Sequence, residues 1–241
     1  MVRVAQGKGI SFDSACSGFT VSGDDGTNAT TGNDRGVLFE GQYGQTWTGI
    51  AFTNSCSTAS GTDDRHSFSH TTFANTTDYA ISAGSRHGSS PSSNANVGNF
   101  TMEGVAFNNV GGAVSHGSGQ GTVFDITDFE VNDASESCFH FPGDSVVSLT
   151  EGEMDGCNSG SASGEGAVVS ESGSGGSLFM ENVTVTDAYG NLVNVALADV
   201  TMNNITASGG SGNLLVHTGS GHLAMNNVDS SGCLLYTSPS P

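Results

Sequence analysis

A nine-residue pattern that occurs three times between residues 177 and 231 constrains the fold more than any other feature of this chain. The copies are Ser177–Val185, Asp199–Ala207 and His222–Ser230, and they start 22 and 23 residues apart. Each copy places apolar residues two positions apart and an Asn just before a further apolar residue. Alternate residues of a strand point to one side, and a fixed period near 22 stacks like residues on each other, as in a solenoid. The pattern therefore predicts successive coils of parallel β-strands.

The pattern extends toward the N-terminus with less regularity. We define the apolar residue that follows the Asn as the corner-flanking position of each coil. The residues expected at this position are Phe19, Ile50, Phe73, Val105, Phe129, Met154, Val183, Ile205 and Val228. The residue just before it is mostly Gly, Asn or Asp, including Asp128, Asn182 and Asn204. These residue types tolerate a left-handed backbone, so we expect a sharp corner there.

A second short apolar run follows the corner-flanking position within the same coil, after one expected turn. It reads Ala80-Ile81, Ala113-Val114, Cys138-Phe139, Ala167-Val168, Leu192-Val193 and Leu214-Leu215. Each coil is thus expected to read strand, corner, strand, turn, strand, turn. This succession resembles the right-handed parallel β-helix of the pectate-lyase-like superfamily, with an Asn ladder at the corner. The predicted fold class is all-β, a right-handed single-stranded parallel β-helix (solenoid) of about nine coils of 22–32 residues.

The boundaries of the repeat lead to an expectation about domains. We expect residues 1–232 to form a single β-helix domain that is a fragment of a longer protein. The segment Cys233–Pro241 departs from the repeat, contains two prolines and resembles a translated sequencing adapter, so we expect a non-native tail. Met1–Gly7 lacks the apolar centre of a signal peptide. We nevertheless expect an extracellular or cell-surface location, with the signal peptide absent from this fragment.

The charge of the chain is strongly negative, with 24 Asp and Glu against five Lys and Arg and a net charge of −19. Such a surface repels nucleic acid and anionic membranes, so we exclude both as direct partners. The sequence also has no run of 18 apolar residues that would insert into a membrane. The partners that we expect are polysaccharides or other cell-surface components.

Carboxylates gather in the middle coils, where the expected register stacks Asp128 on Glu153 at the corner and Glu130 on Asp155 one strand further. Like charges about 5 Å apart are unfavourable unless one is protonated or a cation lies between them. Two further carboxylates are close in sequence, Asp125 and Glu151.

Three interpretations of these carboxylates remain open. Exposed carboxylates that tolerate each other in salt are the interpretation that we favour. Alternatively, Asp128, Glu130, Glu153 and Asp155 bridge adjacent coils through Ca²⁺, the cofactor that such oxygen ligands suit. In the third interpretation, Asp128 and Glu153 are catalytic and hydrolyse a glycosidic bond as a carboxylate pair.

Two other polar clusters precede the regular coils. The first offers oxygen ligands for calcium but matches no EF-hand, so we expect a solvated loop; it comprises Asp24, Asp25, Asn28, Asn33 and Asp34. The second has metal-ligating and acid–base side chains at a spacing that fits no metal motif; it comprises Asp63, Asp64, His66 and His87. We expect a loop with a local ion pair there, and His70 directed inward at the position of Met180.

The cysteines suggest one cross-link. Cys138 and Cys157 lie 19 residues apart on neighbouring coils and are candidates for a disulfide. No C-x-x-C pair occurs, so zinc is not expected.

The function that we favour is a non-catalytic β-helix segment of a larger secreted or cell-surface protein, serving as a stalk, adhesin or carbohydrate-contacting surface. The alternative is a fragment of a β-helix polysaccharide lyase or glycoside hydrolase. As the resemblance implies, those enzymes hold acidic polysaccharides with Lys and Arg. All five Lys and Arg of this chain precede residue 87, so we lean against an enzyme. Ice binding needs an unbroken ladder of outward Thr. The outward residues expected four positions before the corner-flanking residue are Thr46, Ser69, Thr101, Asp125, Thr150, Phe179, Thr201 and Ala224. Asp125 and Phe179 interrupt that row.

Overall fold

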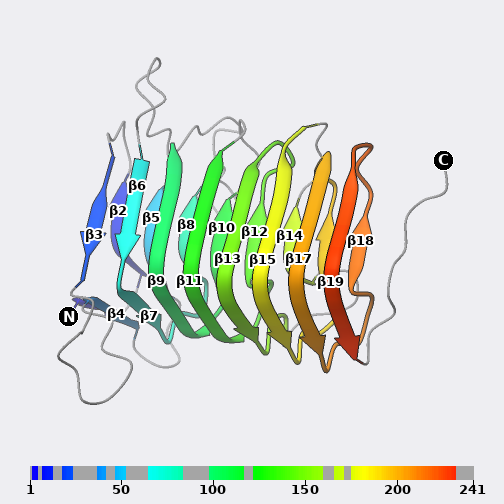
Figure 1. Ribbon diagram of the computed structural model, residues 1–241. Helices are drawn as coiled ribbons and strands as arrows, with labels where there is room; N and C mark the ends of the chain where they lie inside the picture. Colours follow the sequence, from blue (N-terminus) through cyan, green and yellow to red (C-terminus); the bar gives the residue numbers. More distant parts are fainter. Residues whose placement is uncertain are drawn as a thin grey trace.

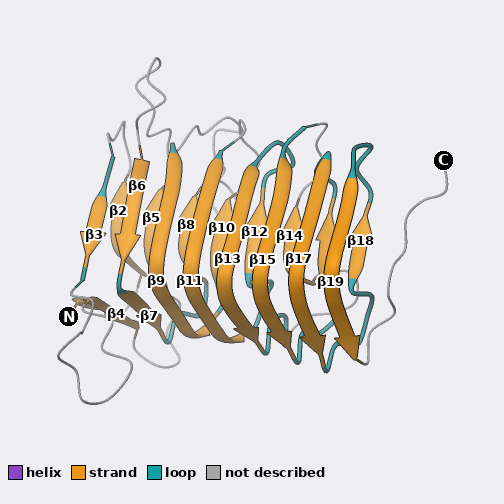
Figure 2. Ribbon diagram, in the orientation of Figure 1, coloured by secondary structure: helices purple, strands orange, loops and turns teal. Residues whose placement is uncertain are grey.

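The computed structural model describes residues 2–4, 7–12, 18–23, 37–41, 47–52, 65–83, 98–116, 122–159, 166–170 and 175–231. All regular secondary structure in these ranges is β-strand (Figures 1 and 2). The strands are β1 (Val2–Val4), β2 (Gly7–Phe12), β3 (Thr20–Ser22), β4 (Val37–Gly41), β5 (Trp47–Phe52), β6 (Arg65–Ser69), β7 (Thr71–Ala74), β8 (Tyr79–Ala83), β9 (Asn99–Val110), β10 (Gly112–His116), β11 (Val123–Ala134), β12 (Phe139–Phe141), β13 (Val146–Asp155), β14 (Gly166–Ser170), β15 (Ser177–Thr186), β16 (Asn191–Val195), β17 (Asp199–Ser208), β18 (Leu215–His217) and β19 (Leu223–Ser231). The prediction of an all-β chain is confirmed for the described residues.

The strands form two sheets of parallel strands. The eleven-stranded sheet has the order β1-β4-β7-β9-β11-β13-β15-β17-β19, with β3 and β6 paired beside it, and the eight-stranded sheet has the order β18-β16-β14-β12-β10-β8-β5-β2. From β7 onward the chain alternates between the sheets, so each repeat adds one strand to each. Figure 1 shows the resulting row of long bent strands with the short strands behind them. This arrangement is compatible with a parallel β-helix or a similar solenoid. No described segment forms a helix long and apolar enough to cross a membrane.

The register of the three regular copies is the one that the sequence predicts. The pairs Val183↔Ile205 and Ile205↔Val228 align the corner-flanking positions of β15, β17 and β19. The second apolar run is confirmed from β8 to β18 of the short sheet, where the aligned residues are Ile81, Val114, Phe139, Val168, Val193 and Leu215. Inward rows from both sheets form one buried core, because each coil covers the apolar side chains of its neighbour.

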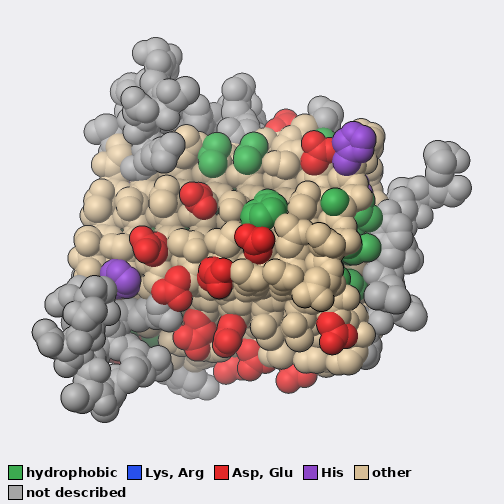
Figure 3. Space-filling model, viewed as in Figure 1, with side chains coloured by type: hydrophobic (Ala, Val, Ile, Leu, Met, Phe, Trp, Pro, Cys, Tyr) green, Lys and Arg blue, Asp and Glu red, His purple; other side chains and the backbone are tan. Residues whose placement is uncertain are grey.

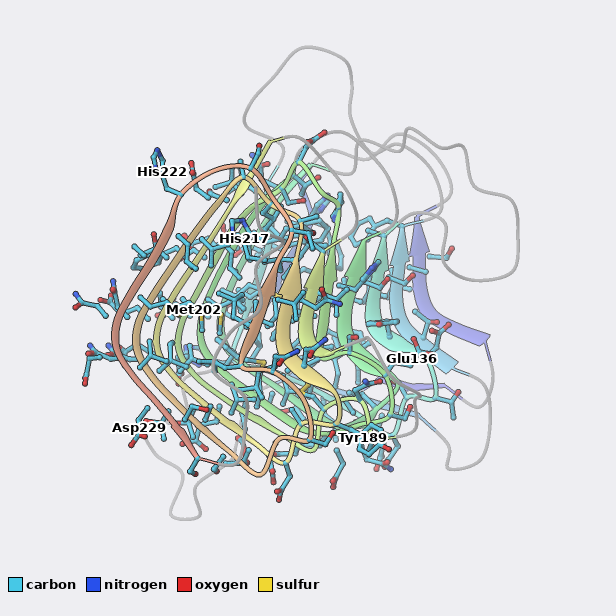
Figure 4. All side chains as sticks on the ribbon, turned by 90° about the vertical axis from the view of Figure 1, so that its right-hand side faces the viewer. Glu136, Tyr189, Met202, His217, His222 and Asp229 are labelled. Atoms are coloured by element: carbon cyan, nitrogen blue, oxygen red, sulfur yellow. A yellow bond between two sulfur atoms is a disulfide. The ribbon has the colours of Figure 1, made fainter. Side chains whose placement is uncertain are left out.

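Like residues stack within that core. The rings of Phe39, Phe73 and Phe107 form a column with centroids 4.9 and 5.4 Å apart and interplanar angles of 11° and 8°. Phe100 and Phe124 stack at 5.1 Å in a second row. Figure 4 looks along the direction in which the coils stack. It shows Met202 inside the ring of strands, whereas His222 and Asp229 project outward.

The placement of Met154 at the corner-flanking position is wrong by two residues. Gly152 pairs with Val183 and with Phe129, and Met154 pairs instead with Val131 and Val185. The pattern missed this because the inward site carries no side chain. A Cβ on Gly152 would collide with the Phe129 ring, which fills the space that an apolar residue occupies in other coils.

The corner-flanking positions expected in the N-terminal coils, before residue 98, are also wrong. Phe73 pairs with Phe107, which follows Val105 by two residues. Ile50 belongs to the short sheet, where it pairs with Ile81. Phe19 directly precedes β3, which pairs with β6, so it lies at the level of His66. In these coils, apolar residues of both sheets fit the spacing that we used to place the corner-flanking position. The sequence alone does not show to which sheet each of them belongs.

The corner that the sequence predicts is present. A left-handed backbone, with φ between 47° and 63°, occurs at His70, Gly104, Asp128, Glu151, Asn182, Asn204 and Asn227. The amide of Asn204 donates to the Asn182 side-chain oxygen at 2.9 Å, and that of Asn227 donates to Asn204 at 2.8 Å. His70 is therefore at the corner and is not directed inward as we expected; Phe68 takes the inward position beside Met102.

Candidate functional site

The candidate site is a hollow of about 420 Å³ at the corner where β11, β13 and β15 lie side by side. Its walls are almost entirely polar, and the residues that line it are Asp128, Phe129, Glu130, Glu151, Gly152, Glu153, Asn182 and Thr184. Four of these eight residues are carboxylates, all from β11 and β13. The buried Phe129 and the side-chain-free Gly152 form its floor. We call this group of four carboxylates, Asp128, Glu130, Glu151 and Glu153, the acidic corner.

The carboxylates of the acidic corner occupy two levels. Glu130 and Glu153 are direct partners in the register of β11 and β13, so their side chains leave the same face about 4.8 Å apart. Asp128 and Glu151 precede the paired residues Phe129 and Gly152, and both have a left-handed backbone. Each level therefore places two like charges on neighbouring strands.

Amide groups partly offset this charge. The Asn182 amide donates to Glu151 Oε1 at 2.6 Å, and the Asn132 amide donates to Glu130 Oε1 at 2.7 Å. The first bond joins β15 to β13, whereas the second lies within β11. The arrangement can hold a hydrated cation or a group of hydrogen-bond donors against the corner.

The structure brings together three of the four residues that the sequence predicts as metal ligands. Asp128, Glu130 and Glu153 line the hollow, whereas Asp155 lies further along β13 and accepts a 2.6 Å hydrogen bond from the Thr186 hydroxyl. Glu151 takes the place of Asp155 in the group. The predicted stacking partners are therefore wrong: Asp128 neighbours Glu151 and not Glu153, and Glu130 pairs with Glu153 and not Asp155.

Within the described ranges, no three Asp, Glu, His or Cys side chains are placed to hold one ion. Glu151 was missed as a lining residue because the two-residue shift placed Glu153 at the corner. The shift would have been visible from residue types alone had Gly been admitted at the inward position.

His66, the described member of the second polar cluster, is part of the core. Its ring is fully buried between Phe52 and Phe100, with centroids at 4.6 and 5.0 Å, and its Nδ1 lies 3.2 Å from the Phe19 amide nitrogen. The remaining candidates of the two early clusters lie outside the described residues: Asp24, Asp25, Asn28, Asn33, Asp34, Asp63, Asp64 and His87. The tail 233–241 lies outside them as well.

A second feature is the broad outer face of the long strands before the corner, which we call the front face (Figure 3). It carries in-register rows of short polar side chains, and one row reads Thr101, Asp125, Ser148, Phe179, Thr201 and Ala224. Ser148 replaces the Thr150 that we expected in this row. Phe179 is half-buried, while the apolar residues on either side of it in sequence point into the core.

One cross-link joins neighbouring coils. Cys138 and Cys157 form a disulfide with a Cα–Cα distance of 5.4 Å, and both residues are fully buried. The pairing considered from their spacing is thus confirmed. It links the turn before β12 to the turn after β13, on the coils that carry the acidic corner.

Comparisons of the chain with protein-family models, with curated proteins and with solved structures find no match.

Proposed function

We propose that this chain is a non-catalytic segment of a larger secreted or cell-surface protein, and that its front face contacts carbohydrate. The observation that carries the proposal is the unbroken register of the outward rows from β9 to β19. Six neighbouring strands hold hydroxyl, amide and carboxylate groups at a spacing of about 4.8 Å. A rigid, repeating surface of this kind suits a repeating ligand, since few groups must be ordered when it binds.

The disulfide supports the proposed location. Disulfides form and persist in oxidising compartments such as the extracellular space and are rare in the cytosol. Cys138 and Cys157 are both fully buried, so the bond lies inside the stack and is shielded from solvent. A covalent bond between coils also stabilises the fold, because it constrains the unfolded chain.

The finer fold that we propose is the right-handed, single-stranded parallel β-helix of the pectate-lyase-like type. Sequential strand order within each sheet and alternation between the sheets support it. Parallel strands joined by crossover connections are overwhelmingly right-handed, and this supports the handedness.

Cleavage of a glycosidic bond is the second candidate, and the acidic corner is the feature that favours it. A retaining or inverting hydrolase requires two carboxylates on opposite sides of the bond. Asp128 and Glu153 come from neighbouring strands and both line the hollow, which supports this candidate. The same residues would bind Ca²⁺ if the ion drew the carboxylates of β11 and β13 together, and we propose this as the cofactor role of the corner.

The test combines binding and cleavage on the full chain. We would pass the protein through gels that contain neutral, anionic or amino-sugar polysaccharides and measure its retardation, and then assay the same mixtures for new reducing ends. Retardation without new ends is the expected result. New reducing ends that disappear in Asp128→Asn or Glu153→Gln would replace the proposal with the hydrolase, and neither retardation nor cleavage would contradict both.

A further inference from the structure

The charge of the front face restricts the kind of carbohydrate that it can bind. Before the corner, the long strands β9, β11, β13, β15, β17 and β19 carry four carboxylates on this face, Glu103, Asp125, Glu181 and Asp199, and none of these strands contains Lys or Arg. Figure 3 shows carboxylates over this side of the molecule, more densely in its lower half, and no Lys or Arg among the described residues in view. An anionic polysaccharide such as a polyuronate would be repelled along its whole length, whereas a ligand with regularly placed positive charges would be attracted.

Phe179 supplies an apolar contact within this charged face. It is half-buried in its row, with Ser148 of β13 and Thr201 of β17 as register partners on either side. A pyranose ring has an apolar face and a rim of hydroxyl groups. An aromatic ring flanked by hydroxyl side chains matches both parts, since the ring covers the apolar face while the flanking groups form hydrogen bonds.

Two carboxylates lie at defined offsets from Phe179. Asp125 occupies the same row two strands away, with Ser148 between them, which corresponds to about 9.6 Å. Glu181 follows Phe179 by two residues on β15, roughly 7 Å along the strand. Asp125 is exposed, and Phe179 and Glu181 are partly exposed.

The spacing favours a sugar chain over a basic peptide. The rows repeat at about 4.8 Å, close to the length of one pyranose in an extended β-1,4-linked chain. An extended peptide presents side chains on one face at about 6.6–7 Å, and these drift out of step with the rows after two strands.

We propose that the front face binds a polysaccharide of amino sugars with free, protonated amines. One ring stacks on Phe179, and ammonium groups contact Asp125 and Glu181. This inference rests on the proposed carbohydrate-contacting function and specifies the chemical class of the ligand.

The experiment is a calorimetric titration of the full chain with four hexasaccharides at low salt. The probes are β-1,4-linked glucosamine, its N-acetylated counterpart, cellohexaose and hexagalacturonate, and hexalysine serves as the peptide probe. We expect the glucosamine hexamer to bind at least tenfold more tightly than any other probe, and its affinity to fall steeply with added salt.

Variants locate the contact. Phe179→Ala and the double variant Asp125→Asn/Glu181→Gln should each weaken glucosamine binding roughly tenfold. Tyr189→Ala and Asp229→Asn are the matched controls, because they remove an exposed aromatic ring and an exposed carboxylate away from these rows, and they should leave the affinity unchanged.

Each other outcome overturns the inference in a distinguishable way. Equal binding of the N-acetylated or cello-hexamer would identify a neutral-sugar surface and leave the proposed function intact. Hexalysine binding that ignores Phe179→Ala would indicate a basic-protein partner. Binding of none of the five probes would contradict the amino-sugar site together with the proposed contact face.

Discussion

The coils of β15, β17 and β19 differ from those of β11 and β13 in what they place at the same corner. The regular coils hold Asn182, Asn204 and Asn227, whose amides bond from coil to coil. The acidic coils hold Asp128 and Glu151 in the same left-handed conformation. Two ionised carboxylates cannot donate hydrogen bonds to each other, so the ladder does not continue from Glu151 to Asp128. A repeat that sacrifices a stabilising contact in one place is a candidate for function there.

Loss of the disulfide should have the largest effect, because it joins the acidic coils. The regular segment 158–232 contains no Cys. The Cys138→Ala/Cys157→Ala variant should lose about 3 kcal/mol of unfolding free energy in urea, the chain-entropy value for a loop of 19 residues. The reduced parent is the control and should match the variant. A loss below about 1 kcal/mol would show that the acidic coils are held by their core alone.

Breaking the Asn ladder should rank second. Asn tolerates the left-handed backbone at position 204, where φ is 52°, and Ala does not. Asn204→Ala also removes the hydrogen bonds to Asn182 and Asn227. We expect a loss of about 2–3 kcal/mol from backbone strain and lost hydrogen bonds. Asn204→Gly keeps the backbone freedom and should lose less, as measured by urea unfolding. Equal losses would remove the conformational part of the explanation.

Extending the ladder into the acidic coils should stabilise the protein. Glu151 has a φ of 53°, which costs an ordinary residue about 1–2 kcal/mol, whereas Asn tolerates it. We expect Glu151→Asn to gain about 1 kcal/mol of unfolding free energy in urea. Glu153→Gln removes the same charge at a position outside the left-handed region and controls for electrostatics. An equal gain in both variants would mean that charge, and not the corner conformation, limits these coils.

The smallest expected effect concerns calcium. Glu130 and Glu153 repel each other on neighbouring strands by an amount on the order of 0.5 kcal/mol. In the presence of physiological salt, millimolar Ca²⁺ should raise the thermal midpoint of the parent by a few degrees and leave Glu130→Gln/Glu153→Gln unchanged. A parallel rise in both proteins would assign the effect to ions bound elsewhere.

The same two regions show how far the sequence predicts the structure. In the regular coils, Met, Asn and apolar residues recur at fixed offsets, so their register follows from sequence. In the acidic coils the inward position is Gly152, and its space is filled by Phe129 from the previous strand. The pattern admitted only apolar side chains at the inward position and not a Gly whose space a neighbouring strand fills, so the corner was placed two residues late. The same shift explains the error in the predicted group of carboxylates: Glu151 lines the hollow in place of the predicted Asp155.

The prediction for the N-terminal coils was wrong for a different reason. Ile50 and Ile81 are inward-facing in the short sheet, and inward apolar positions of the two sheets have the same alternation. Only long-range pairing distinguishes them. The half-buried position of Phe179, by contrast, agrees with the outward row predicted from the repeat, since its offset is fixed by Met180 beside it.

The most direct test of carbohydrate contact at the front face is hydroxyl-radical footprinting of two partly exposed aromatic rings, Phe179 and Tyr189. The protein would be labelled alone and saturated with cellohexaose or glucosamine hexamer, whichever it retains, and oxidation of both rings would be quantified by mass spectrometry. We predict that the sugar slows oxidation of Phe179 several-fold and leaves Tyr189 unchanged, because Tyr189 lies in the turn after β15, away from the front face. Unchanged oxidation of Phe179 under saturation would contradict the claim that carbohydrate binds this face.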